Sequence, residues 1–148
     1  MIDLVLSPHF LLSEFMRSDT ASKFGIDNVP NLEHVANMQQ LCIQVLEPLR
    51  CAFDVPIVIG SGFRSVELNR RVGGSVTSQH MQGMAADIRC QSVELGNAFF
   101  DWIRCHCEFD QLIRERAYKA SKTFWIHVSY RADGMNRKQV INDLIKNK

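Results

Sequence analysis

Apolar residues recur at steps of three and four between residues 31 and 50, which is the spacing of one face of an α-helix. These positions are Val35, Met38, Leu41, Cys42, Val45 and Leu46. Asn31 stands directly before them as a helix cap, and Glu33 follows in the first turn. We therefore predict a long amphipathic helix here. A second such helix is predicted over residues 92–106, where the apolar face would comprise Val93, Leu95, Ala98, Phe99 and Ile103.

Short apolar and β-branched segments predict strands over residues 55–60, 84–89, 109–115 and 124–130. The polar segment 116–122 would join the last two strands as a hairpin-like pair. Shorter helices are predicted over residues 10–15 and 65–71, and a final helix over residues 136–148. Helices followed by strands mixed with one long helix indicate an α+β fold, with a small antiparallel sheet and helices packed on one face. We expect one domain across residues 1–148, with its core at about residues 12–131.

Composition narrows the class of protein. The chain of 148 residues is 46% hydrophobic and 22% charged, which is ordinary for a globular domain. Its net charge of +1 gives no indication of a nucleic-acid partner. The odd count of 5 cysteines, irregularly spaced, does not suggest a disulfide framework. The first residues lack a signal-peptide pattern, and no apolar run reaches membrane-spanning length. We therefore expect synthesis in the cytoplasm without a signal peptide, and no membrane insertion.

Three polar residues stand where strand alternation would bring chemistry to one face of the sheet. If Ile126 and Val128 point into the core, His127 projects from the opposite face. The same alternation places Asp87 on the outer face of the strand over 84–89, and His80 lies seven residues before it. Two neutral imidazoles and one carboxylate are three ligands for zinc, and a catalytic zinc keeps its fourth position open. This set predicts a metal-dependent hydrolase.

The frame around these residues is specific in combination. Ser-x-His-x-x-Gly-x-Ala-x-Asp over residues 78–87, followed by Trp-Ile-His-Val-Ser over 125–129, resembles the zinc D-Ala-D-Ala carboxypeptidase family. That family includes peptidoglycan carboxypeptidases, vancomycin-resistance dipeptidases and phage endolysin endopeptidases. Ser-Gly-Phe-Arg-Ser at 61–65 matches an upstream segment of these proteins, and Phe-Asp-Gln-Leu-Ile at 109–113 is similar to the small, often phage-borne branch.

The resemblance implies a hedgehog/D-Ala-D-Ala-peptidase-like fold with a zinc site on the open face of the sheet. It implies His80, Asp87 and His127 as the ligands of Zn²⁺. Arg64 would orient the substrate or stabilise an oxyanion, although a surface salt bridge is its simpler interpretation. Ser78 would support a ligand or contact substrate, and its simpler interpretation is a turn residue.

The position at which the family carries its general base differs in this chain. Many relatives carry an acid three residues before the last histidine ligand, where this chain has Phe124. Glu115 and Asp110 are the nearest carboxylates in sequence. If Gln111 pairs opposite His127, Glu115 shares the face of the metal site, whereas a slip of one residue would favour Asp110. We predict Glu115 as the base and keep Asp110 as the alternative.

These features predict a zinc-dependent peptidase acting on a peptide bond in peptidoglycan stem peptides or cross-links, as a D,D-carboxypeptidase or an endolysin-like endopeptidase. It would act as a monomer at the bacterial cell wall, after holin release or as a virion component. The alternative is a catalytically silent cell-wall-peptide or zinc-binding module of a phage particle, which Phe124 favours. A third interpretation is a structural α+β domain in which His80 and Asp87 only pair with each other.

Overall fold

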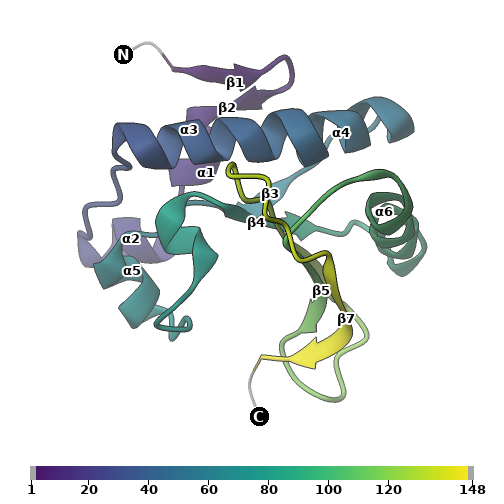
Figure 1. Ribbon diagram of the computed structural model, residues 1–148. Coiled ribbons are helices and arrows are strands. Elements are labelled where there is room, and N and C mark those ends of the chain that lie inside the picture. The colour runs from purple at the N-terminus through teal and green to yellow at the C-terminus, as the bar shows by residue number, and fades with distance from the viewer. Residues whose placement is uncertain (1–2, 147–148) are drawn as a thin grey trace.

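A mixed five-stranded sheet forms the centre of the protein (Figure 1). The computed structural model describes residues 3–146. The strand order is β3 (Ile59–Ser61), β4 (Ala85–Arg89), β6 (Trp125–Ser129), β5 (Gln111–Arg116) and β7 (Gln139–Ile145). Neighbouring strands are antiparallel except β5 and β7, which are parallel. A separate antiparallel ribbon is formed by β1 (Val5–Ser7) and β2 (Phe10–Leu11).

Helices precede the sheet and are inserted between its strands. They are α1 (Leu12–Met16), α2 (Asp19–Phe24), α3 (Leu32–Leu41), α4 (Glu47–Phe53), α5 (Val66–Arg71) and α6 (Val93–His106). The π-helical turn η1 (Cys42–Leu46) joins α3 to α4, and the 3₁₀ turn η2 (Gln79–Gln82) precedes β4. The predicted long helix is thus confirmed, and the Asn31 side chain caps it by accepting a hydrogen bond from the His34 amide at 2.8 Å. The helix continues through Pro48, which lies in the first turn of α4 beside η1.

One face of the sheet is apolar and covered by helices. Ala86, Ile88, Ile126 and Val128 on β4 and β6 are fully buried. They belong to one core cluster with residues of α3, η1, α4 and α6. The predicted α+β class and the packing of helices on this face are therefore confirmed. Alternation along the strands leaves the opposite face for polar side chains, where η2 contacts both β4 and α5.

The end of the chain corrects the predicted final helix over residues 136–148. Residues 139–145 form β7, which pairs with β5 through partners such as Leu112 and Val140, while 147–148 lie outside the described residues. An unpaired β5 edge would leave backbone donors and acceptors open, and β7 satisfies them. Val140 also packs against the core, so the packed domain extends past residue 131. The sheet is consequently mixed and not wholly antiparallel.

Two further predicted boundaries shift toward shorter elements. The predicted helix over 10–15 begins only at Leu12, because Phe10 and Leu11 pair with β1. The strand predicted over 55–60 is reduced to Ile59–Ser61, and the residues before it approach the sheet without regular pairing. The helices over 65–71 and 92–106 form within one residue of prediction.

Gly83 connects η2 to β4 at a position where a larger side chain should lower the stability of the fold. Its φ is 73°, and a β-carbon there would overlap the carbonyl oxygen of His34 in α3. Gly73 has the same backbone conformation, with φ 74°, and open space around it. Gly73→Ala should therefore lower the free energy of unfolding by about 1–2 kcal/mol, which is the strain of an alanine in the left-handed conformation. Gly83→Ala should cost about 2–5 kcal/mol, because overpacking adds to that strain. Urea unfolding measures both losses, and equal losses would contradict the contact with His34.

Candidate metal centre

His80, Asp87 and His127 come together from three elements on the open face of the sheet. Asp87 on β4 lies directly opposite His127 on β6. Asp87 Oδ1 is 3.2 Å from Nε2 of His80 and 3.1 Å from Nδ1 of His127. All three potential ligand atoms lie within 4.8 Å of one another. The structure therefore brings together the three residues that the sequence predicts as metal ligands.

A backbone contact fixes which nitrogen of His80 faces the cluster. Nδ1 lies 2.7 Å from the carbonyl oxygen of Gly62. A carbonyl oxygen can only accept, so Nδ1 carries the proton and donates, and Nε2 presents its lone pair to Asp87. Burial lowers the pKa of His80, which favours this neutral form. Donation of the outer ring nitrogen to a carbonyl is the usual support of a metal-bound histidine.

The carboxylate of Asp87 completes a donor set that suits a cation. Burial raises the pKa of Asp87. The neighbouring imidazoles of His80 and His127 lower it by more than burial raises it, so the pKa lies well below its usual range. An ionised oxygen thus faces the lone pair of His80 at 3.2 Å. Two acceptors at that distance need a proton or a metal between them. Ligand atoms around a tetrahedral zinc are about 3.2–3.4 Å apart for nitrogen and oxygen donors. The separation of 3.2 Å from His80 to Asp87 falls in this range, and that of 3.1 Å from His127 to Asp87 lies just below it.

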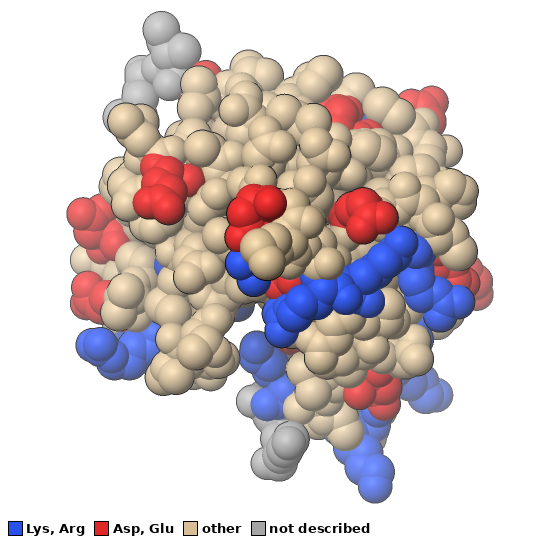
Figure 2. All heavy atoms as spheres, viewed as in Figure 1, with Lys and Arg blue, Asp and Glu red and all other residues tan. Residues whose placement is uncertain are grey.

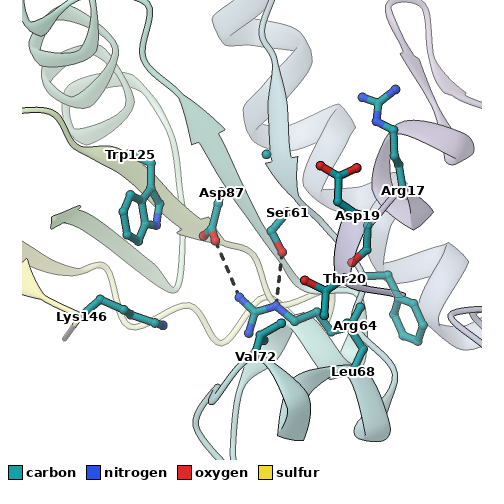
Figure 3. A pocket seen from close by; sticks show the side chains of 13 residues that line it. Arg17, Asp19, Thr20, Ser61, Arg64, Leu68, Val72, Asp87, Trp125 and Lys146 are labelled. Atoms are coloured by element: carbon teal, nitrogen blue, oxygen red, sulfur yellow. Dashed lines mark hydrogen bonds and ion pairs between the residues drawn. The ribbon is translucent and has the colours of Figure 1, made fainter. Parts of the chain in front are cut away.

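Arg64 is a buried cation beside the cluster, and not the surface salt bridge that was its simpler interpretation. Its side chain is held by Ser61 and Asn69, with Nε donating to Ser61 Oγ at 3.2 Å and Nη1 donating to Asn69 Oδ1 at 2.9 Å. Nη2 lies 3.7 Å from Oδ2 of Asp87 (Figure 3). Burial lowers the pKa of Arg64, while Asp87 and Glu115 raise it. The guanidinium nevertheless stays charged, because arginine does not deprotonate in proteins.

Glu115 lies on the same face of the sheet as the cluster. Ile113 pairs opposite His127, which is two residues from the register supposed above, with Gln111 opposite His127. A shift of two preserves the face, and Glu115 Oε1 lies 3.9 Å from His127 Nδ1. The Glu115 side chain is almost fully buried, and its Oε2 has no hydrogen-bond partner among the described residues.

Asp110 makes a different set of contacts. Arg137 donates from Nε and from its backbone amide to Oδ1, each at 3.0 Å, and from Nη2 to Oδ2 at 2.8 Å. Gln79 donates to the same Oδ2 at 2.8 Å. The hydrogen bonds from Arg137 lower the pKa of Asp110 to about 2. Its oxygens are therefore occupied in holding the segment before β7 to the sheet.

Ser78 supports the turn that carries His80. Its hydroxyl oxygen accepts a hydrogen bond from the His80 amide at 3.2 Å, at the first position before η2. Ser78 also lines the hollow that contains His80 and His127. This hydrogen bond is that of a turn residue, which was the simpler interpretation, and the place of Ser78 is also compatible with support of a ligand and with contact to substrate.

Two hollows flank the cluster, and we refer to them together as the cleft. The first, of about 330 Å³, contains Arg64, Asp87 and Trp125, and the second, of about 570 Å³, contains Glu115 and His127. Figure 2 shows the surface hollowed between the lobe of α2 and α5 and the lobe of β5 and β7. Lys146 lines both hollows, the first of which is drawn in Figure 3. Its Nζ lies 3.7 Å from Glu115 Oε2.

Sequence reasoning missed Lys146 because it stands in the segment predicted as a helix. The sequence did indicate Trp125 as a residue near the site, because strand alternation puts it on the same outer face as His127. No comparable signal marks Lys146, whose position depends on the parallel pairing of β7 with β5. Its backbone amide donates to the Arg116 carbonyl at 2.8 Å, which places the side chain at the cleft.

Comparison with known proteins defines the class. Residues 8–129 match the sequence model of the Peptidase M15 family, and the chain belongs to this family. A segment of 44 residues is 50% identical to the zinc D-Ala-D-Ala carboxypeptidase of Streptomyces albus G. That segment covers 29% of this chain and 17% of the Streptomyces enzyme. Together these similarities indicate Zn²⁺ as the metal cofactor. Over the described residues, the helices are too short or too polar to cross a bilayer.

The Asp110–Arg137 contact predicts a pH-dependent contribution to stability. Asp110→Asn should lower the free energy of unfolding by about 1–3 kcal/mol at neutral pH, because the buried acceptor loses its charge. The pKa of Asp110 is lowered to about 2 in the fold, against about 3.9 in an unfolded chain. The carboxylate therefore stabilises fully above about pH 5, and this contribution is lost as the pH falls through about 2.

Urea unfolding of Asp110→Asn and the natural chain between pH 7 and pH 2 measures this contribution. The gap in stability should narrow below about pH 4. The exposed residue Asp101 provides the matched control, because Asp101→Asn should give a small and constant gap. A gap for Asp110→Asn that stays constant down to pH 2 would show that its ion pair does not stabilise the fold.

Proposed function

We propose that this chain is a zinc-dependent peptidase that hydrolyses a peptide bond in peptidoglycan stem peptides or cross-links. The observation that carries the proposal is the convergence of His80 and His127 on one oxygen of Asp87. Arg64 and Glu115 border this cluster within one cleft, and membership of the Peptidase M15 family supports a peptidase. The proposal treats the chain as one peptidase domain.

In this account His80, Asp87 and His127 hold Zn²⁺ and leave its fourth position to the cleft. When bound, the ion polarises the scissile carbonyl and lowers the pKa of a water molecule toward neutrality. Donation from His80 to the Gly62 carbonyl keeps the imidazole oriented. The fully buried apolar residues behind the two strands hold Asp87 and His127 at a fixed separation.

Glu115 serves as the general base. Its carboxylate accepts the proton of the attacking water and then gives it to the leaving amine. Its Oε1 lies 3.9 Å from His127, and its Oε2 has no hydrogen-bond partner among the described residues and faces the Lys146 ammonium at 3.7 Å; both features support this role. Phe124, which stands where many relatives have an acid, belongs to the apolar core cluster. A proton carrier must therefore come from another strand, and β5 supplies Glu115.

Arg64 stabilises negative charge on the substrate. Its Nη2 faces Asp87 at 3.7 Å, while Nε and Nη1 are held by Ser61 and Asn69. The fixed guanidinium can stabilise charge that develops on the carbonyl oxygen, or it can pair with a substrate carboxylate. Ser78 holds η2 and so positions His80.

The cleft supports a peptide substrate. Hollows of about 330 Å³ and about 570 Å³ lie on either side of the cluster, with room for residues before and after the scissile bond. The Streptomyces enzyme is named a D-Ala-D-Ala carboxypeptidase. We accordingly include both D,D-carboxypeptidase and endopeptidase activity in the proposal, with an endolysin-like role at the bacterial cell wall. The competing candidate is a silent wall-peptide-binding module, which the presence of Phe124 favours.

Digestion of purified peptidoglycan of several wall chemistries tests the proposal. Mass spectrometry of the soluble products should show peptide fragments whose release stops when a zinc chelator is added, because the chelator removes the ion from the cleft. The fragment masses would identify the bond that is cleaved. Binding to the wall without any fragment would overturn the peptidase and support the silent module.

The same assay tests the general base. Glu115→Gln should lower the rate of fragment release by about 10²- to 10⁴-fold, because glutamine cannot carry the proton. Its zinc content should equal that of the natural chain. The exposed residue Glu108 is the matched control, and Glu108→Gln should leave the rate unchanged. Full activity of Glu115→Gln would disprove the base assignment while leaving the peptidase itself intact.

A further inference from the structure

A second group of metal-ligating side chains lies outside the cleft. It comprises His9, Glu47 and Cys51, whose potential ligand atoms lie within 4.8 Å of one another. His9 stands in the turn between β1 and β2, and the other two residues belong to α4. The three residues do not line either hollow of the cleft. Any ligand they hold would therefore be separate from the peptidase site.

Helix spacing and a turn produce this group. Glu47 and Cys51 are four residues apart on α4, so both side chains project from the same helix face. The β1–β2 turn approaches that face, and the Ser7 hydroxyl and the His9 amide each donate to Glu47 Oε1 at 2.8 Å. These two hydrogen bonds fasten the turn to the helix and fix the orientation of the carboxylate.

The other carboxylate oxygen faces the remaining two donors. Glu47 Oε2 is 2.5 Å from His9 Nδ1 and 3.7 Å from Cys51 Sγ. The turn is already attached through Oε1, so the imidazole and the thiol are not needed for that attachment. A carboxylate whose second oxygen is held by hydrogen bonds is the arrangement that supports metal ligation. Oε2 of Glu47 therefore lies next to the imidazole nitrogen of His9 and the thiol sulfur of Cys51, as it would if all three atoms were ligands of one metal ion.

The chemistry of the three donors suits zinc, which binds imidazole nitrogen, carboxylate oxygen and thiolate sulfur. Ligand atoms around tetrahedral zinc lie about 3.3–3.8 Å apart when sulfur is included. The Glu47–Cys51 separation of 3.7 Å falls in that range, and the His9–Glu47 pair would open by about 1 Å. His9 and Cys51 are exposed, which leaves a path for the ion and a place for water as the fourth ligand.

We propose that His9, Glu47 and Cys51 form a second Zn²⁺ site that joins the β1–β2 turn to α4. Binding replaces the proton between His9 and Glu47 and removes the proton of the Cys51 thiol. Because the unfolded chain does not hold these residues together, zinc binding here stabilises the fold by mass action. The site acts as a structural link and takes no part in peptide hydrolysis.

Zinc stoichiometry measured by native mass spectrometry, at a fixed buffered zinc concentration, tests the second site. The natural chain should bind two ions, and Cys51→Ala and His9→Gln should each bind one. His80→Ala should also bind one, because it removes the ion of the cleft. Cys105→Ala is the matched control, since Cys105 is another exposed free thiol, and it should still bind two. Two ions retained by both Cys51→Ala and His9→Gln would overturn the proposal.

Thiol labelling of the natural chain gives a readout that needs no variant to fold. Zinc should slow the labelling of Cys51 by about tenfold or more, because a ligated thiolate is a poor nucleophile, and a chelator should restore the rate. Labelling of Cys105 should not change. An unchanged rate at Cys51 would overturn the second site. Zinc binding that only His80→Ala abolishes would also overturn it, while leaving the peptidase proposal standing.

Discussion

The antiparallel pairing of β4 with β6 is the constraint on which the rest of the structure depends. It places Asp87 directly opposite His127 and, on the other side of the same strands, Ile88 opposite Ile126. One pairing therefore sets the apolar face that the helices cover and the polar face that carries the candidate metal centre. A slip of one residue would exchange the two faces, so burial of the core fixes the geometry of the site.

Burial also decides the electrostatics of that polar face. Asp87 and Arg64 are largely removed from water, and such charges are costly unless they are paired. Imidazoles surround the carboxylate, and Ser61 and Asn69 hold the guanidinium. A divalent ion in the cluster would balance the negative charge of Asp87 more completely than hydrogen bonds from imidazoles can. The zinc assignment and the tight packing behind β4 and β6 thus follow from the same burial.

Much of this arrangement could be predicted from sequence because it depends on local periodicity. Strand alternation places Asp87 and His127 on one face, and Glu115 joins them for any register shift of even length. The order of the strands depends on contacts between distant segments, which local patterns do not encode. The segment over residues 136–148 was therefore predicted as a helix, and Lys146 could not be placed beside Glu115. The contact of His9 with Glu47 is equally distant in sequence.

The central claim is that His80, Asp87 and His127 hold one zinc ion on the open face of the sheet. Anomalous diffraction at the zinc edge, from crystals of the zinc-loaded chain, tests it most directly. The account predicts a peak about 2.0–2.2 Å from Nε2 of His80, the carboxylate of Asp87 and Nδ1 of His127. Zinc-loaded crystals with no peak there, and with both imidazoles still in direct contact with Asp87, would contradict it.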